Sequence, residues 1–277
     1  MKFKKIYLEI TNVCNLSCSF CHGTARTPHF LTPAEFDSLA EKLHNYTEYL
    51  YFHLMGEPLL HPELGELLNL ARSHGFKVNL TTNGFLLPEA ADTLLAAPAL
   101  HRINISLQSW EANATSIGLD HYVNSCCDFS RRAAAQGVLI SFRLWNGGGA
   151  ESRNPEILQL LHAAFPDEWQ TGQRNLVLSK GVFLEFGDKF DWPDQEAAET
   201  GACFCRGLRD QIGILCDGTV IPCCLDADGH LALGNLFDSS LSSILEGPRA
   251  RAIYDGFSRR QATESLCRKC GYAARFS

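Results

Sequence analysis

The sequence of 277 residues has no apolar run that approaches the roughly 20 residues a membrane-spanning helix needs. Its N-terminus, MKFKKIYLEI, begins with charge but has too short an apolar segment for a secretory signal peptide. Lysine and arginine number 24 against 31 aspartates and glutamates, so the basic face typical of nucleic-acid binders is not expected. These absences predict a soluble, cytoplasmic protein with no membrane partner, and they disfavour a nucleic-acid partner.

Cysteine, in contrast, is abundant, with twelve in the chain. In a reducing compartment disulfides are disfavoured, and clustered thiols more often bind metal or carry out redox chemistry. Three cysteines lie between residues 14 and 21, two at 126 and 127, and seven between residues 203 and 270. Two cysteine groups separated by a long body predict two metal sites on one scaffold.

The first group, TNVCNLSCSFCHG, places Cys14, Cys18 and Cys21 directly after the apolar run IYLEI. A structural zinc site takes four ligands, and an ordinary 4Fe–4S cluster also takes four cysteines. Three thiols without a nearby fourth therefore predict a metal site that keeps one position open for chemistry. A zinc site or a ferredoxin-like site is the structural alternative.

From residue 5 to about residue 180, short β-type runs alternate with longer helix-type stretches. This alternation predicts a parallel sheet with helices outside it, arranged as a barrel or a doubly wound sheet. In both architectures ligands bind at the carboxyl ends of the strands, where the cysteine loop, MGEP and TTNG converge. The predicted strands are residues 5–10, 49–54, 76–82, 101–107 and 138–145, with a weaker sixth at 175–179.

Taken together, these residues resemble the radical S-adenosylmethionine (SAM) superfamily over nearly the whole chain. The spacing Cys14-x3-Cys18-x2-Cys21 after the first strand matches the superfamily's cluster motif, and Phe20 also fits it. The resemblance implies that these three catalytic cysteines hold three irons of a 4Fe–4S cluster and that SAM chelates the fourth. Electron transfer then cleaves SAM to methionine and a 5′-deoxyadenosyl radical, which abstracts a substrate hydrogen.

The stretch LMGEPLLHP is similar to the family's Gly-Gly-Glu-Pro motif, which holds the amino group of SAM. Met55 replaces the first glycine, whereas Gly56, Glu57 and Pro58 match. Glu57 is a suitable acceptor for an ammonium group, and Gly56 lets the backbone approach closely. By their position after a strand, three further residues are implied to contact the ribose or carboxylate of SAM: Asn83, Ser106 and Arg143.

The C-terminal cysteines resemble the auxiliary-cluster regions called SPASM or twitch domains. Cys205, twelve residues, Gly218, four residues and Cys223 satisfy their pattern, and CRKC then supplies Cys267 and Cys270. A full SPASM domain carries a further dense four-cysteine block that this sequence lacks. The resemblance therefore implies the shorter twitch form, with one auxiliary 4Fe–4S cluster held by Cys205, Cys223, Cys267 and Cys270.

Other interpretations of the cysteines stay open. The C-terminal four are also compatible with a zinc ribbon, of which CRKC alone is half. Cys203, Cys216 and Cys224 each neighbour a proposed ligand, so any of them could replace it or donate a hydrogen atom to a substrate radical. Cys126 and Cys127 fall within a predicted helix and are expected to be buried structural thiols.

The predicted fold class is α/β. We expect a radical SAM core, a partial (β/α)6 TIM-like barrel, over residues 1–184. A small α+β twitch/SPASM-like region follows over residues 185–277. The resemblance implies an oxidoreductase that dehydrogenates a small metabolite or a peptide or protein residue, with the auxiliary cluster as electron acceptor. A flavodoxin- or ferredoxin-type reductant is implied as partner.

Two alternative functions remain. The first is a peptide-modifying enzyme that crosslinks or epimerises residues. Such enzymes commonly carry an N-terminal leader-binding domain, which we do not expect because the first strand begins by residue 5. The second is a non-catalytic iron–sulfur electron carrier, against which the MGEP motif argues because a carrier has no use for an ammonium-binding carboxylate.

Overall fold

The computed structural model describes residues 2–276. An eleven-stranded sheet runs through it in the order β11-β10-β9-β1-β2-β3-β4-β5-β8-β7-β6. From β9 to β8 every neighbouring pair is parallel. These parallel strands are β9 (Gln211–Ile214), β1 (Lys5–Leu8), β2 (Tyr49–Phe52), β3 (Lys77–Thr82), β4 (Leu100–Ser106), β5 (Leu139–Gly147) and β8 (Val182–Asp188). The predicted partial (β/α)6 barrel is confirmed.

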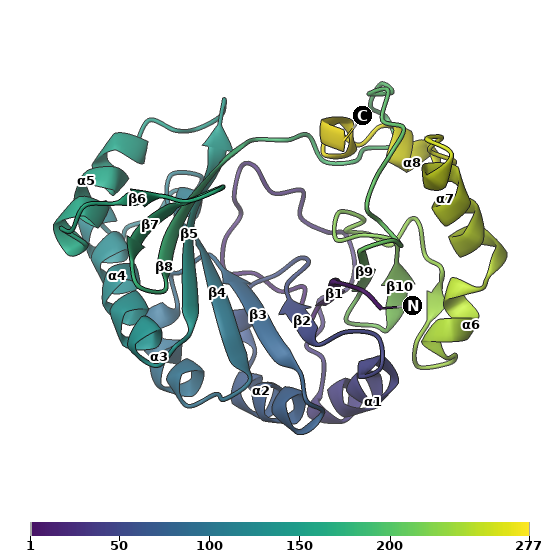
Figure 1. Cartoon of the computed structure of the whole chain (residues 1–277), viewed down its shortest axis with the longest axis horizontal. Helices are drawn as coiled ribbons and strands as arrows, with labels where there is room; N and C mark the ends of the chain where they lie inside the picture. The colour runs from purple at the N-terminus through teal and green to yellow at the C-terminus, as the bar shows by residue number, and fades with distance from the viewer. Residues whose placement is uncertain (1, 277) are drawn as a thin grey trace.

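Helices cover the outer face of the curved sheet (Figure 1). They are α1 (Pro33–Leu43), α2 (Leu64–Ser73), α3 (Leu87–Leu95), α4 (Leu119–Ala135) and α5 (Asn154–Ala164). The first of them begins with a capping box, in which the Thr32 hydroxyl accepts from the Glu35 N–H and the Glu35 carboxylate accepts from the Thr32 N–H. Among the helices described between residues 2 and 276, none is long and apolar enough to cross a membrane.

Smaller elements complete both ends of the sheet. β6 (Gln170–Thr171) and β7 (Leu176–Ser179) extend one edge in antiparallel fashion. At the other edge lie β10 (Thr219–Ile221) and β11 (Gly234–Asn235), also antiparallel. The C-terminal helices are α6 (Leu241–Leu245), α7 (Pro248–Ser258) and α8 (Ser265–Arg268), and short 3-10 helices lie at η1 (Pro58–Leu60), η2 (Leu107–Ser109) and η3 (Ala273–Phe276).

Alternation along the strands separates an apolar outer face from a polar interior. Phe52 of β2 is fully buried and packs edge-on against Phe36 of α1, with ring centroids 5.6 Å apart. Because neighbouring residues of a strand face opposite sides, Tyr51 faces the barrel interior, where its ring lies 5.2 Å from that of Tyr7 on β1. The helix-side face thus holds the hydrophobic core, and the interior is left for polar side chains.

The structure corrects the prediction for the sixth strand. The sequence predicts it at residues 175–179, but β7 at that position is antiparallel to β8, and β8 itself completes the parallel set. The charged and glycine-containing sequence VFLEFGD of β8 obscures its strand character. The expected domain boundary between residues 184 and 185 falls inside β8. The C-terminal region continues the same sheet, because β9 pairs with β1.

The segment after β8 crosses the open side of the barrel to reach the C-terminal region (Figure 1). On its way it contacts the loop that follows β1. The Trp192 indole N–H donates to the Phe20 carbonyl at 3.0 Å, and the Trp192 ring stacks on His22 at 5.8 Å. The crossing segment is therefore held against the cysteine loop.

The turn between β9 and β10 depends on Gly218, whose φ is +82°. A Cβ there would lie 2.5 Å from Cδ2 of Phe237. We expect Gly218→Ala to lower the free energy of unfolding by about 2–4 kcal/mol, from left-handed backbone strain plus overpacking. Chemical denaturation measures the change.

Gly137→Ala is the matched control, because Gly137 has a φ of +87° but no atom within 4 Å of the added Cβ. It should show only the backbone cost of about 1–2 kcal/mol. Equal losses in the two variants would contradict the packing argument.

Candidate active site and auxiliary cysteine site

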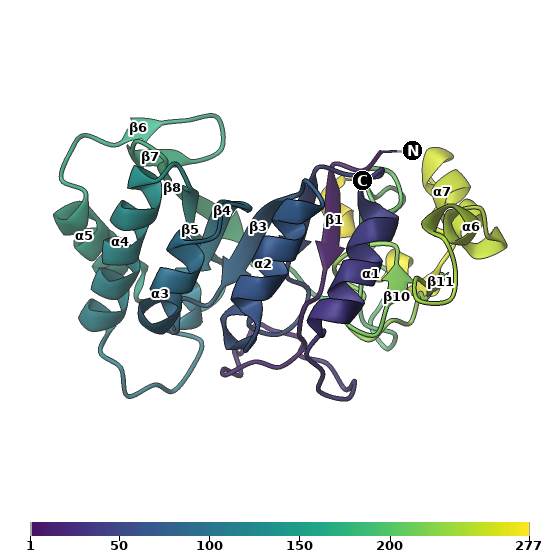
Figure 2. The same cartoon turned by 90° about the horizontal axis from the view of Figure 1, so that it is seen from below.

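The loop after β1 extends beyond the carboxyl ends of the strands (Figure 2). It carries Cys14, Cys18 and Cys21, and each of these thiols accepts one N–H hydrogen bond. The donors are Leu16 N to Cys14 Sγ (3.5 Å), Asn113 Nδ2 to Cys18 Sγ (3.1 Å) and Gly23 N to Cys21 Sγ (3.4 Å). Burial raises the pKa values of Cys14 and Cys21, and the backbone N–H donors oppose that rise. Hydrogen bonds to sulfur also tune iron–sulfur potentials. This donor set fits a cluster held by three cysteines.

Asn113 is a residue that the sequence analysis missed. Besides its bond to Cys18, its Oδ1 accepts from the Ser17 N–H at 3.0 Å, and its Nδ2 donates to the Ser109 carbonyl at 2.7 Å. It lies in the segment after η2, far from the cysteine motif in sequence and with no recognisable motif of its own. Asn113 positions the middle of the cysteine loop.

A buried carboxylate holds the base of this loop. Glu9, directly after β1, is 0% exposed and accepts three hydrogen bonds. The donors are Arg26 Nη2 at 2.6 Å, Cys216 N at 3.1 Å and Met55 N at 3.2 Å. Glu9 thereby joins the cysteine loop, the MGEP segment and the β9–β10 hairpin. Neither Glu9 nor Arg26 belongs to a sequence motif that would mark it as a site residue.

A second contact ties the far side of the loop to the C-terminal region. The Asp228 carboxylate accepts from the Thr24 hydroxyl at 2.6 Å and from the Ala25 N–H at 3.0 Å. The Arg26 Nε donates to the Ala227 carbonyl at 2.8 Å. Because these partners come from opposite ends of the chain, folding of the C-terminal region positions the three-cysteine loop.

The MGEP segment lies beside the loop. Gly56 adopts a φ of +76°, and the Glu57 carboxylate, 1% exposed, accepts from Asn83 N at 2.7 Å and from Leu59 N at 3.0 Å. Burial raises the pKa of the Glu57 carboxyl to about 7, although these N–H groups lower it. Asn83 Nδ2 also donates to Asn15 of the cysteine loop at 2.8 Å. The loops after β1, β2 and β3 therefore meet around Glu57.

The other residues predicted to contact SAM do not all lie beside Glu57. Pro58 begins η1, which Glu57 caps. Phe20 lines a small pocket together with Gln108 and Trp145. Ser106 ends β4, in register with Arg143 on β5. Arg143 itself faces the middle of the barrel, where its contacts are with Glu185 and Trp145.

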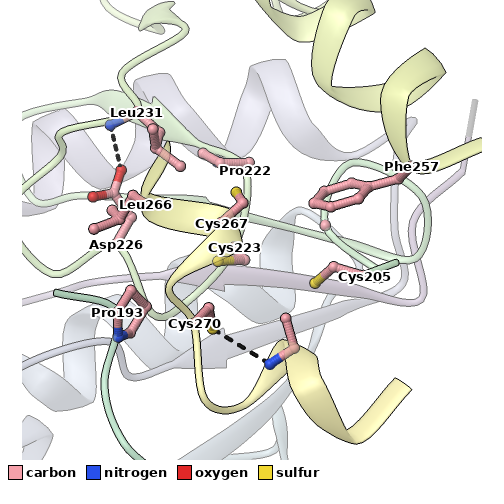
Figure 3. Close-up of a pocket in the computed structure, with 12 residues that line it drawn as sticks. Pro193, Cys205, Pro222, Cys223, Asp226, Leu231, Phe257, Leu266, Cys267 and Cys270 are labelled. Atoms are coloured by element: carbon pink, nitrogen blue, oxygen red, sulfur yellow. Dashed lines mark hydrogen bonds between the residues drawn. The ribbon is translucent and has the colours of Figure 1, made fainter. Parts of the chain in front are cut away.

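The C-terminal region gathers the second set of thiols. Cys205, Cys223, Cys267 and Cys270 line one pocket, and Figure 3 shows them around it. Their other neighbours are largely apolar, including Pro222, Leu231, Phe257 and Leu266. Burial raises the pKa of Cys223 well above its ordinary value, and the charges of Cys205 and Cys267 add to the shift. Uncharged thiols are thus favoured until a metal group neutralises the thiolates.

Three neighbouring cysteines are not among the residues that line this pocket. Cys216 lies beside Glu9 and Arg26, and burial with the charge of Glu9 raises its pKa to about 12. Cys224 accepts a hydrogen bond from Tyr7 of β1. Cys203 is partly buried, and Cys205, rather than Cys203, is among the pocket-lining residues.

Zinc would require thiols gathered about 2.3 Å from one ion. Within residues 2–276, no group of three or more His, Cys, Asp or Glu side chains is arranged to hold a single metal ion. Cys126 and Cys127 of α4 are fully buried, as expected for structural thiols.

Comparison with known proteins identifies two domains. The profile of the radical SAM superfamily matches residues 8–135, and that of the SPASM iron–sulfur cluster-binding domain matches residues 203–271. The chain carries a radical SAM domain followed by a SPASM domain. These domains imply SAM, a radical SAM 4Fe–4S cluster and auxiliary iron–sulfur clusters as cofactors, and the two cysteine sites have donor sets that fit them.

Curated relatives match part of the chain. A probable GTP 3′,8-cyclase of Methanocaldococcus jannaschii is 31% identical over 112 residues, which are 39% of this chain and 37% of the relative. One from Saccharolobus islandicus is 34% identical over 105 residues, 37% of this chain and 34% of the relative. The chain thus spans little more than a third of the length of these relatives.

Solved structures match almost all of the chain. BtrN in complex with AdoMet and 2-DOIA superposes with a TM-score of 0.61 at 17% identity, covering 98% of this chain and 94% of BtrN. Streptococcus suis SuiB superposes with a TM-score of 0.66 at 14% identity, covering 99% of this chain and 72% of SuiB. The anSMEcpe structure with bound AdoMet superposes with a TM-score of 0.65 at 14% identity, covering 97% of this chain and 86% of anSMEcpe. At these identities the likeness shows the fold alone.

The packing of Gly56 against the cysteine loop is testable. A Cβ at Gly56 would lie 2.5 Å from the Thr11 carbonyl oxygen and 2.9 Å from that of Val13. We expect Gly56→Ala to displace the loop and to weaken SAM binding about 5- to 150-fold, as overpacking of 1–3 kcal/mol implies. The SAM-induced change in the electron paramagnetic resonance (EPR) spectrum of the reduced cluster, titrated with SAM, measures this affinity.

Gly75→Ala is the control for backbone strain. Gly75 has a φ of +82° and nothing within 4 Å of the added Cβ, and it lies between α2 and β3. A SAM affinity equal to wild type in Gly56→Ala would show that the close approach at Gly56 does not matter.

Proposed function

We propose that this radical SAM enzyme is an oxidoreductase that removes a hydrogen atom from a small metabolite or from a residue of a peptide or protein. When bound, SAM and the three-cysteine cluster supply a 5′-deoxyadenosyl radical, and a four-cysteine cluster supplies an electron acceptor. The substrate then loses one hydrogen atom, one proton and one electron, a net two-electron oxidation. A flavodoxin- or ferredoxin-type reductant delivers the electron that cleaves SAM.

The observation that carries this proposal is the pairing of two different cysteine sites on one sheet. Three thiols with one N–H donor each lie at the carboxyl ends of the strands, and four thiols line a largely apolar pocket in the adjoining region. A site with three ligands leaves a coordination position for SAM, whereas four cysteines saturate a 4Fe–4S cluster and suit it to electron transfer.

The roles of the site residues follow from this proposal. Cys14, Cys18 and Cys21 ligate the open cluster. Glu57 accepts hydrogen bonds from the SAM amino group. Gly56 and Pro58 set the path of the backbone on either side of Glu57, where SAM approaches it. Asn83, Ser106 and Phe20 complete the SAM site. The auxiliary cluster is held by Cys205, Cys223, Cys267 and Cys270.

Modification of a peptide is the second candidate. Among structures similar to this chain are SuiB bound to the precursor peptide SuiA and anSMEcpe with a Cp18Cys peptide. BtrN, in complex with AdoMet and 2-DOIA, is matched over more of its own length than either.

Anaerobic reconstitution tests the proposed function. We expect about eight irons per chain, because two 4Fe–4S clusters are assigned, and SAM should perturb only one EPR signal. With all three of Cys14, Cys18 and Cys21 changed to Ala, dithionite-driven formation of 5′-deoxyadenosine should stop while about four irons remain. The matched variant Cys127→Ala removes a buried thiol outside both cysteine sites. It should retain both the formation of 5′-deoxyadenosine and the full iron content. Cleavage of SAM by the triple variant would contradict the proposal.

The Glu57 assignment predicts a pH dependence. A carboxyl with a pKa of about 7 is increasingly protonated below that pH and must lose its proton before it accepts from the SAM amino group. SAM affinity should therefore rise up to about tenfold per pH unit below pH 7 and level off above it.

Titration of SAM between pH 5.5 and 8.5 in wild type and in Glu57→Gln isolates this effect. The amide cannot titrate, so the step should be missing from the variant even though its affinity is lower throughout. Two profiles of the same shape would rule out Glu57 as the titrating group.

A further inference from the structure

The interior of the barrel carries charged side chains that the SAM site does not use. On β5, Phe142 packs outward against Phe165, with ring centroids 6.2 Å apart, so the neighbouring Arg143 faces inward. Arg143 lies in register with Glu185 of β8, and its Nε is 3.6 Å from a Glu185 oxygen. Arg102 of β4 approaches the other Glu185 oxygen at 3.8 Å.

Positive charge exceeds negative charge in this group. Two guanidinium groups, which do not lose their protons in proteins, share one carboxylate. Both distances are longer than a direct hydrogen bond. The side chains of Arg143, Arg102 and Glu185 are only 17%, 29% and 23% exposed, so water screens the excess charge incompletely. An anion placed between the guanidinium groups would balance it.

The field of this excess charge reaches across the barrel. Burial, together with the positive charges of Arg143 and Lys5, lowers the pKa of His53 to about 3. His53 follows β2, Lys5 lies on β1, and neither strand neighbours β5 in the sheet. His53 is therefore uncharged at neutral pH and adds no charge of its own, and the excess charge of Arg143 and Arg102 over Glu185 disfavours a cationic substrate group here.

Unpaired polar atoms surround the two arginines. Within the described residues, Arg143 Nε, His53 Nδ1, Ser141 Oγ and Asn104 Oδ1 are buried without a hydrogen-bond partner. Asn104 and Ser141 are 1% and 0% exposed and lie in register on β4 and β5. Buried polar groups are nearly always paired in native structures. Donors and acceptors left unpaired at neighbouring interior positions point to a polar ligand that pairs with them.

This interior group lies between the two cysteine sites. On one side, the Arg143 guanidinium stacks over Trp145 at 4.3 Å, and Trp145 lines the same pocket as Phe20 of the cysteine loop. On the other side, the Arg143 charge acts on His53, whose ring lies edge-on to that of Tyr7 at 5.2 Å. The Tyr7 hydroxyl donates to Cys224 beside the auxiliary site. Side-chain contacts thus connect the interior group to residues beside each cysteine site.

We propose that Arg143 and Arg102 bind an anionic group of the substrate, a carboxylate or a phosphate, inside the barrel. This inference rests on the proposed function and narrows it to substrates that carry such a group. The sequence resemblance implies that Arg143 contacts SAM. The proposal assigns Arg143 to the substrate instead. Planar guanidinium groups suit both anions because they can donate two parallel hydrogen bonds.

Calorimetric titration of the reconstituted holoenzyme with SAM bound tests the proposal. The probes are inorganic phosphate, succinate and an Ala-Glu-Ala peptide blocked at both ends. We expect saturable binding of at least one probe. Arg143→Gln and Arg102→Gln should each weaken it about tenfold or more through loss of charge-assisted hydrogen bonds. Arg143→Lys should restore part of the loss.

Arg132→Gln is the matched control, because Arg132 on α4 is 55% exposed and pairs with Asp92 on the outer surface. It should bind the probes as wild type does. Iron content of each variant verifies that the clusters are loaded.

The three probes separate the sources of the anion. Preference for phosphate indicates a phosphorylated substrate, preference for succinate a small carboxylate, and preference for the peptide an acidic residue. No saturable binding of any probe, or equal binding by wild type, Arg143→Gln and Arg102→Gln, would overturn the proposal. Formation of 5′-deoxyadenosine by wild type is measured in parallel. Its absence would refute the proposed function, whereas its presence without anion binding would refute this inference alone.

Discussion

The two halves of the site depend on one buried carboxylate. Glu9 is fully buried, and its ion pair with Arg26, at 2.6 Å, is completed by N–H groups from Met55 and Cys216. Removing one partner of such a buried pair typically costs about 3–5 kcal/mol because the other charge is left uncompensated. The three partners come from the cysteine loop, the segment after β2 and the C-terminal hairpin. The loop that carries the three-cysteine motif is therefore held in position by contacts with the C-terminal region.

The same logic explains how the chain keeps two sets of thiols ready for iron. Around Cys14, Cys18 and Cys21 the structure supplies one N–H donor to each sulfur, although burial outweighs these donors and raises the pKa values of Cys14 and Cys21. Around the C-terminal four, burial and mutual repulsion raise the pKa values of Cys223 and Cys267. Binding of iron there releases protons and is coupled to folding. N–H donors are present at both sites, among them Ala273 N to Cys270 Sγ, and at both sites burial disfavours bare thiolates until iron binds.

Local patterns predicted much of this arrangement. β–α alternation predicted the parallel sheet because it is a property of short segments. The grouping of Cys205, Cys223, Cys267 and Cys270 around one pocket was implied by the resemblance to SPASM and twitch domains and not by local spacing. The sixth strand was misplaced because β8 carries Glu185 and Gly187 where a strand pattern would show apolar residues. Asn113, Asp228 and Glu9 could not be identified from sequence. Their roles depend on partners distant along the chain, and a lone Asn, Asp or Glu in a loop carries no periodicity and no motif.

The two faces of β4, β5 and β8 differ in what they contribute: one face stabilises the fold, and the other carries charged side chains. A sheet optimised for stability would fill its interior with apolar side chains, since buried charges repay their desolvation only when fully paired. Here the interior positions of β4, β5 and β8 instead carry Arg102, Arg143 and Glu185, with one carboxylate for two guanidinium groups. The apolar residues on the opposite face of the same strands are fully buried, among them Ile103, Phe142 and Leu184. One face of each strand thus stabilises the fold, and the other retains an excess of positive charge that a bound anion would neutralise.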